Sequence, residues 1–234
     1  GVASILNPFD MYAVEEGIRI KEKLGGTVTV LSMGPPQAAE QLKEAIAMGV
    51  DDAILVTDRA FAGSDTLATS YALAKAIEKM GGVNLIICGK QAIDGDSAQV
   101  GPELAEKMGL PHLTYVKKIE EISETEVTLE RMNEDGYERV QMPLPGLITV
   151  VKEINEPRMP SLKGMMRAKK AEVTMWNAAA INAEPAKCGL NGSPTWVKKI
   201  FIPELKCQGE IFHGEPDEQV KSLVNALMCQ KVIV

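Results

Sequence analysis

The chain has 234 residues, 45% of them hydrophobic, which is enough to bury one large domain or one domain with an appendage. Its formal net charge of −7 and pI near 5.1 argue against a nucleic-acid-binding surface, and no apolar run is long enough to span a membrane. Four scattered cysteines without a CxxC pair indicate a reducing, cytoplasmic compartment. Two histidines outside any cysteine or carboxylate cluster argue against a metal site and a His-based triad.

Segments with helical and strand character alternate as far as Leu110. Asn7 is expected to cap the first helix, with Pro8 at its first position. The predicted helices span residues 9–24, 37–48 and 97–108, with another that runs from a Ser64 or Asp65 cap to Met80, and the predicted strands span residues 27–33, 53–57 and 83–88. This alternation predicts an α/β fold, a doubly wound and mostly parallel sheet whose ligands bind beyond the carboxyl ends of the strands.

The stretch from Gly89 to Leu104 joins a buried strand to a helix and is the best candidate site. Its glycines, aspartates and hydroxyl leave backbone N–H groups uncovered at a helix N-terminus, which Asp96 or Ser97 is expected to cap. Such a place suits a phosphate. The spacing matches neither a Walker loop nor the usual dinucleotide fingerprint, and a capped turn that binds nothing accounts for these residues equally well.

After Leu110 the pattern changes. Two strands, 127–131 and 138–141, are predicted to form a hairpin around a glycine turn, followed by a buried strand over 147–151. The prolines in Asn155–Pro160 exclude regular helix and central strand. A basic helix with two methionines follows over 162–170, either as a solvated helix with core methionines or as a docking segment.

The residues from Ala178 onward are rich in proline and small side chains, which predicts an extended arm with a short closing helix over 217–228. Such an arm usually lies on another surface, so we expect a partner chain. We therefore expect an α/β domain over residues 1–177 and an arm over residues 178–234.

Several motifs, in order along nearly the whole chain, resemble the beta subunit of electron-transfer flavoproteins. The motifs are Asn7–Asp10, Gly89–Asp94, Arg131–Val140 with Pro145–Thr149, and Asn155–Arg158. The resemblance implies a Rossmann-like, adenine-nucleotide-binding fold with a β-hairpin insertion and a larger alpha subunit as partner. The family's first strand would precede Gly1, and we expect it to be missing only from this sequence.

The resemblance also implies a cofactor. In ordinary members the beta subunit holds AMP, whereas in electron-bifurcating members it holds FAD, which takes a hydride from NADH. The run Asp94–Pro102 and the entry Asn7–Asp10 are similar to the bifurcating type. We therefore expect FAD, NADH as donor, and electron flow through the alpha-subunit FAD to an acyl-CoA-type dehydrogenase and to ferredoxin or flavodoxin. An AMP-binding scaffold is the alternative, and an adenine-nucleotide sensor of the universal-stress type would leave the hairpin and the arm unexplained.

No catalytic residue and no metal ligand is implied. The cofactor-binding residues implied by the resemblance are Asn7, Pro8, Phe9, Asp10, Met33, Gln91, Asp94, Gly95, Asp96, Ser97, Ala98, Gln99, Val100, Gly101 and Pro102. Gly95 to Gly101 would cradle the phosphates. Within a recognition loop over about residues 155–170, Leu162 would be the apolar anchor for the dehydrogenase. The docking residues implied are Met159, Leu162, Lys163, Met165 and Arg167.

Overall fold

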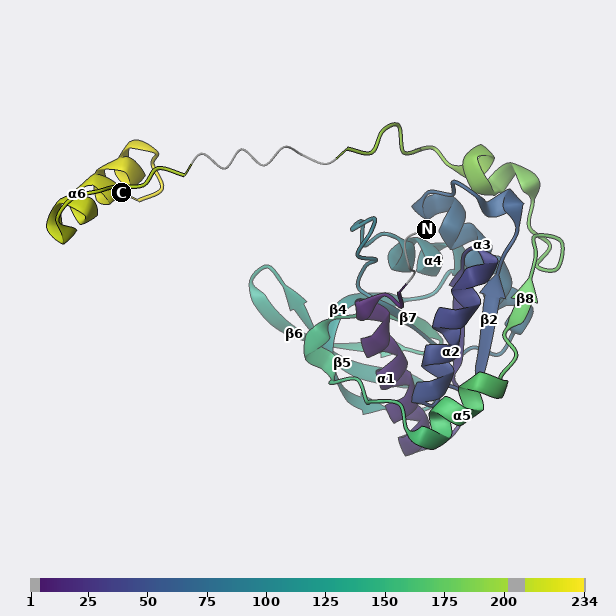
Figure 1. Cartoon of the computed structure of the whole chain (residues 1–234). Coiled ribbons are helices and arrows are strands. Elements are labelled where there is room, and N and C mark those ends of the chain that lie inside the picture. The colour runs from purple at the N-terminus through teal and green to yellow at the C-terminus, as the bar shows by residue number, and fades with distance from the viewer. Residues whose placement is uncertain (1–4, 202–208, 234) are drawn as a thin grey trace. The chain divides into compact units, whose positions relative to one another are not determined.

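The structure, a computed structural model, describes residues 5–201 and 209–233. The chain divides into two units with the boundary between Trp196 and Val197. Figure 1 shows the course of the chain.

The first unit alternates helices and strands as the sequence predicts (Figure 1). Its α-helices are α1 (Pro8–Leu24), α2 (Ala39–Met48), α3 (Thr66–Met80), α4 (Val100–Met108) and α5 (Leu162–Lys170). Its strands are β1 (Thr29–Met33), β2 (Asp52–Val56), β3 (Leu85–Gly89), β4 (His112–Ile122), β5 (Glu126–Asn133), β6 (Gly136–Pro143), β7 (Gly146–Val150) and β8 (Thr174–Trp176). Short 3-10 helices lie between them: η1 (Pro36–Ala38), η2 (Arg59–Phe61), η3 (Lys152–Ile154), η4 (Pro185–Lys187) and η5 (Gly189–Gly192).

The strands form two sheets. The first has the order β1-β2-β8 and is parallel throughout. The second has the order β3-β7-β4-β5-β6, in which β3, β7 and β4 are parallel and β5 and β6 add an antiparallel hairpin. The predicted α/β fold is confirmed, with the difference that within residues 5–201 and 209–233 the sheet is divided between β1 and β3.

Helices cover both faces of these sheets. On β1, Val30 packs with α1 and α2, whereas the next residue, Leu31, packs with α3. On β3, Ile87 packs with α1 and Ile86 with α3 and α4. Because side chains alternate across a strand, α1 and α3 bridge the two sheets from opposite faces. Helix α5 packs beside α2 on the face that bears α1 (Figure 1).

The hairpin is confirmed and one long strand was not predicted. Asn133 pairs with Gly136, so only two residues form the turn between β5 and β6. Strand β4 pairs with both β5 and β7 and thereby joins the hairpin to the parallel strands. Its register shifts, and the paired lysines and paired glutamates on either side of Ile119, interrupt the alternation by which a strand is recognised.

Helix α4 begins later than predicted. The expectation that Asp96 or Ser97 caps it is wrong, because the residue before the helix is Gln99, whose side chain makes no capping hydrogen bond. Asp96 and Ala98 have φ of 51° and 55°. These left-handed conformations cannot continue into a helix, so the chain turns twice before α4 starts.

Residues 177–196 belong to the first unit and pack against the rest of it, rather than forming an extended arm. Ile181 and Cys188 are buried with Ala72 and Ala76 of α3. The structure thus places the division between units after Trp196, downstream of the expected boundary at residue 177. The second unit contains α6 (Pro216–Cys229), which confirms the predicted closing helix. None of the helices in the described ranges has both the length and the apolar character needed to cross a lipid bilayer.

Candidate functional site

The N-terminus of α1 meets the carboxyl end of β3. The Gly89 N–H donates to Asp10 Oδ1 over 2.8 Å. A Cβ at Gly89 would lie 2.6 Å from the carbonyl carbon of Phe9, so only glycine permits this approach. Because β3 and β7 are parallel and in register, with Gly89 opposite Val150, both strands end at this edge. The predicted residues at the start of α1 therefore lie at the edge where ligands of such sheets bind.

Asn7 occupies the N-cap position of α1 and Pro8 the first helical position, as predicted, but the Asn7 side chain connects α1 to the loop after β3. Its Nδ2 donates to Asp10 Oδ2 and to the Gln91 carbonyl, both over 2.9 Å, and the expected capping bond is not formed. Burial is the largest influence on Asp10 and raises the pKa of its carboxyl, although the hydrogen bonds from Asn7 and Gly89 act to lower it. Asn7 Oδ1 is buried without a hydrogen-bond partner in the described part of the chain. A buried acceptor of this kind is costly unless a donor reaches it.

The loop before α4 presents backbone donors. Asp96 and Ala98 are left-handed on either side of Ser97, and Gln99 returns to the right-handed region at φ −97°. Within the described residues, the N–H groups of Ser97, Ala98 and Gln99 have no protein acceptor. Alternation of left- and right-handed residues turns successive N–H groups toward one point and makes a concave anion-binding surface. Strained, non-glycine conformations of this kind concentrate at functional sites.

The aspartates of this loop are engaged with the loop itself. Asp94 accepts a hydrogen bond from the Gly95 N–H over 2.7 Å, and Asp96 accepts one from the side chain of Gln91. A Cβ at Gly95 would meet nothing within 4 Å. The loop is exposed from residue 92 to 97 and is therefore open to a ligand.

Gly101 has a packing role that the sequence did not reveal. It is buried in the first turn of α4, and a Cβ there would lie 2.6 Å from Cγ2 of Thr149 on β7. Glu103, two residues later, accepts a hydrogen bond from Thr66 Oγ1 at the start of α3 over 3.1 Å. These contacts fix the helix behind the donor-bearing loop. Met33 ends β1 and packs into the cluster of Val56 and Phe61.

Two residues at this edge were missed from the sequence. Lys90 Nζ lies 5.2 Å from the ring centre of Phe9 and 5.7 Å from that of Tyr115. Tyr115 has φ of 58°, lies where β4 shifts register against β7, and donates its N–H to Thr149 Oγ1 over 3.2 Å. Lys90 could have been found from the sequence as a lysine directly after a buried strand. Tyr115 could not, because it belongs to the strand that was not predicted.

The segment around α5 exposes apolar side chains. The exposed fraction is 88% for Met159, 73% for Leu162 and 57% for Met166, so these methionines are not core residues. Leu162 and Met166 belong to α5. The Ser161 hydroxyl caps this helix by accepting the Gly164 N–H over 3.0 Å.

Other predicted docking residues differ in their surroundings. Met165 is 44% exposed and Lys163 is exposed. Arg167 Nη2 instead donates to the Asp51 carbonyl over 2.6 Å, which ties α5 to the turn before β2.

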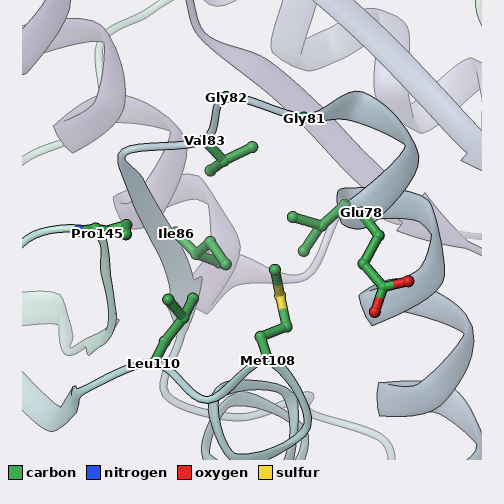
Figure 2. A pocket seen from close by; sticks show the side chains of 9 residues that line it. Glu78, Gly81, Gly82, Val83, Ile86, Met108, Leu110 and Pro145 are labelled. Carbon is green, nitrogen blue, oxygen red and sulfur yellow. The ribbon is translucent and has the colours of Figure 1, made fainter.

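An apolar hollow lies at the other end of β3, away from the glycine loop. Figure 2 shows it between the last turns of α3 and α4, where Val83, Ile86, Met108 and Leu110 line it and Glu78 is its charged residue. Its lining side chains are apolar apart from Glu78, whose carboxylate is paired with Lys75 at 2.7 Å.

Comparison with known proteins places the chain in a family. Residues 1–181 match the electron transfer flavoprotein domain. Over its full length the chain is 51% identical to the electron transfer flavoprotein subunit beta of Thermoanaerobacterium thermosaccharolyticum, of which it covers 89%. It is 45% identical to the protein of the same name from Megasphaera elsdenii, with 90% of that relative covered. It is 47% identical to the caffeyl-CoA reductase-Etf complex subunit CarD of Acetobacterium woodii, with 89% covered. The chain therefore belongs to the electron transfer flavoprotein family, and within it to the beta subunits.

Proposed function

We propose that this chain holds an adenine nucleotide between the start of α1 and the loop before α4, as the small subunit of a two-subunit flavoprotein. The observation that carries the proposal is the set of free N–H groups at Ser97, Ala98 and Gln99, turned by two left-handed residues. Such a set can bind a phosphate without a basic side chain. The buried Oδ1 of Asn7, which has no hydrogen-bond partner among the residues that the structure describes, adds an acceptor for a ligand donor.

FAD is the nucleotide we propose, with NADH as the electron donor. The similarity of Asp94–Pro102 to bifurcating members supports FAD over AMP, and one close relative is named as part of a caffeyl-CoA reductase-Etf complex. When bound, the flavin supplies hydride acceptance and the release of single electrons. The chain itself supplies placement: Asp10 holds Gly89 and Asn7, and α4 backs the loop.

Two surfaces support the proposed partners. In the second unit, α6 exposes Val220, Leu223 and Met228, an apolar face that suits contact with an alpha subunit. In the first unit, Leu162 and Met159 supply an exposed apolar anchor for an acyl-CoA-type dehydrogenase. Ferredoxin or flavodoxin is proposed as the low-potential acceptor, from the resemblance to the bifurcating type.

The nucleotide content of the full-length protein, copurified with its alpha partner, tests this function. Acid release and chromatography should give two FAD for each pair of subunits. One FAD with one AMP would instead make this chain a scaffold that docks dehydrogenases, and NADH would be withdrawn.

Two substitutions at one position connect that content to the loop. Ala98→Pro forces φ to about −65° and removes an N–H, so it should abolish the nucleotide bound by this chain. Ala98→Gly is the matched control, because glycine adopts the left-handed conformation freely and keeps the N–H. Equal nucleotide content in the two variants would remove the loop from the site.

A further inference from the structure

We propose that Lys90 is the charge partner of the nucleotide phosphates, held in position for that contact by the rings of Phe9 and Tyr115. This inference rests on the proposed function and gives a role to a residue that lies outside the group of N–H donors at Ser97, Ala98 and Gln99. Lys90 directly follows β3, and its backbone N–H donates to the Val150 carbonyl over 3.0 Å. Its backbone is therefore fixed at the same sheet edge as Asn7, whose side chain binds the next residue, Gln91.

The two rings restrain the ammonium group from different elements. Phe9 comes from the first turn of α1 and Tyr115 from the irregular part of β4, at 5.2 and 5.7 Å from Lys90 Nζ. A cation at this distance from an aromatic face is attracted to it. The Lys90 side chain is half-buried, and α1, β4 and the end of β3 meet around it. The fold therefore restricts its position.

The ammonium group has no carboxylate partner in residues 5–201 and 209–233: none lies within 4.0 Å of it. The neighbouring acids are occupied by other donors. Asp10 accepts from Gly89 and Asn7, Asp94 from Gly95, and Asp96 from Gln91. The charge of Lys90 is therefore available to an anion from outside the chain.

Two other lysines over aromatic rings differ in this respect. Lys117, 3.3 Å from the ring centre of Tyr137, is paired with Glu130 at 2.9 Å. Lys187, over Tyr71, is paired with Glu184 at 2.9 Å. A third, Lys79, lies 4.9 Å from the ring centre of Trp176 and donates to the Ala180 carbonyl over 2.7 Å instead of pairing with a carboxylate of the described residues. A partly desolvated cation without a carboxylate is favoured where a ligand supplies the negative charge. At an edge that already presents free N–H groups, the ligand class that fits is a phosphate.

The test compares AMP with adenosine, which lacks the phosphate. The full-length chain is purified with its alpha partner, freed of nucleotide, and titrated with each compound by calorimetry at low and high salt. Lys90→Gln should weaken AMP binding by about tenfold, leave adenosine binding unchanged and flatten the salt dependence. Lys90→Arg should keep the preference for AMP. Lys117→Gln is the control, because Lys117 contacts a ring elsewhere, and it should change the affinity for neither AMP nor adenosine.

The outcomes separate this inference from the function on which it rests. If the unaltered protein binds AMP but Lys90→Gln binds it equally well, or loses AMP and adenosine to the same extent, the charge role of Lys90 is wrong and the site stands. If the unaltered protein binds neither AMP nor FAD, the proposed function fails and this inference falls with it. Should Lys90→Gln fail to fold, equal affinity of the folded Lys90→Arg variant for AMP and adenosine would overturn the proposal.

Discussion

Arg158 and Glu15 form an ion pair that fastens the irregular segment after η3 to the middle of α1. The distance from Arg158 Nε to Glu15 Oε2 is 2.8 Å, and the Arg158 N–H also donates to that oxygen over 3.2 Å. The Glu15 side chain is only 2% exposed and is also paired with Arg19 at 2.6 Å. Arg158 extends further to Glu22, which it binds through both terminal nitrogens. One arginine thus holds the chain directly before the exposed Met159.

Arg158→Gln tests this attachment. The change leaves a buried carboxylate with Arg19 as its remaining cation, so it should lower the free energy of unfolding by roughly 2 to 4 kcal/mol. Urea unfolding measures the loss, and faster proteolysis within residues 155–170 would locate it. Arg139→Gln is the matched control, because Arg139 on β6 is exposed and pairs with Glu120 on β4. Equal losses in the two variants would contradict a special role for Arg158.

The pH dependence of stability reports on the same pair. Burial alone raises the pKa of Glu15, but the hydrogen bonds from Arg158 and Arg19 outweigh it and hold the folded-state pKa below its ordinary value of 4.5. A carboxyl with a depressed folded-state pKa adds stability that is fully present above the unfolded pKa and is lost as the pH falls through the folded pKa. The difference in unfolding free energy between unaltered protein and Arg158→Gln should therefore shrink below about pH 4.5.

Glu16 supplies a control of opposite sign for that profile. Burial is the main influence on Glu16 and raises the pKa of its carboxyl, against the hydrogen bond from Asn155. A raised carboxyl pKa destabilises the fold above the unfolded pKa, and that loss is recovered as the pH falls through the folded value. The free energy of unfolding of Glu16→Gln should therefore increase relative to that of the unaltered protein as the pH rises. For the Glu15 pair, a stability difference between the unaltered protein and Arg158→Gln that stayed the same down to about pH 3 would show that ionised Glu15 is not its source.

Local patterns predicted most of the fold because each of these elements depends on neighbours in sequence. The prediction for α5 matches residue for residue, since Pro160 and the Ser161 cap mark its start. The start of α4 was not predictable, because Ala98 is left-handed although alanine rarely adopts that conformation. Periodicity in the sequence shows which face of a helix or strand is buried. The conformation of the loop before α4 depends instead on contacts that periodicity does not reveal.

The site was predictable only in part for a related reason. The start of α1 and the loop before α4 were named from motifs, and the contact of Asp10 with Gly89 brings them together. Lys90 was missed because its ring partners, Phe9 and Tyr115, come from elements far apart in the chain. The pairing of Arg158 with Glu15 spans 143 positions in the same way. Contacts between distant charged or aromatic residues leave no periodic signal in one sequence.

Another prediction concerns the close packing of α4 on β7. Gly101→Ala places a methyl group against Thr149 Cγ2 and should cost about 1 to 3 kcal/mol of stability while weakening nucleotide retention. Gly95→Ala adds the same atom where no protein atom lies within 4 Å and should leave the stability unchanged. Adding Thr149→Ser to Gly101→Ala removes the opposing methyl but keeps the hydroxyl that accepts the Tyr115 N–H. The double variant should recover most of the loss, and no recovery would show that Gly101 is not constrained by Thr149.

The exposed anchor before and within α5 yields the last prediction. Leu162 is 73% exposed, so Leu162→Ala should leave the free energy of unfolding nearly unchanged. If Leu162 enters a pocket on a dehydrogenase, its loss should cost roughly 2 kcal/mol of binding, and electron delivery to that enzyme should slow accordingly. Oxidation of NADH with an artificial acceptor should stay intact, because the proposed nucleotide site lies at the sheet edge and not on α5. Leu24→Ala, at the end of α1 and 51% exposed, is the matched control. Equal loss of both electron-transfer reactions in Leu162→Ala would show that the change acts on the fold or the site, and would remove Leu162 from the docking surface.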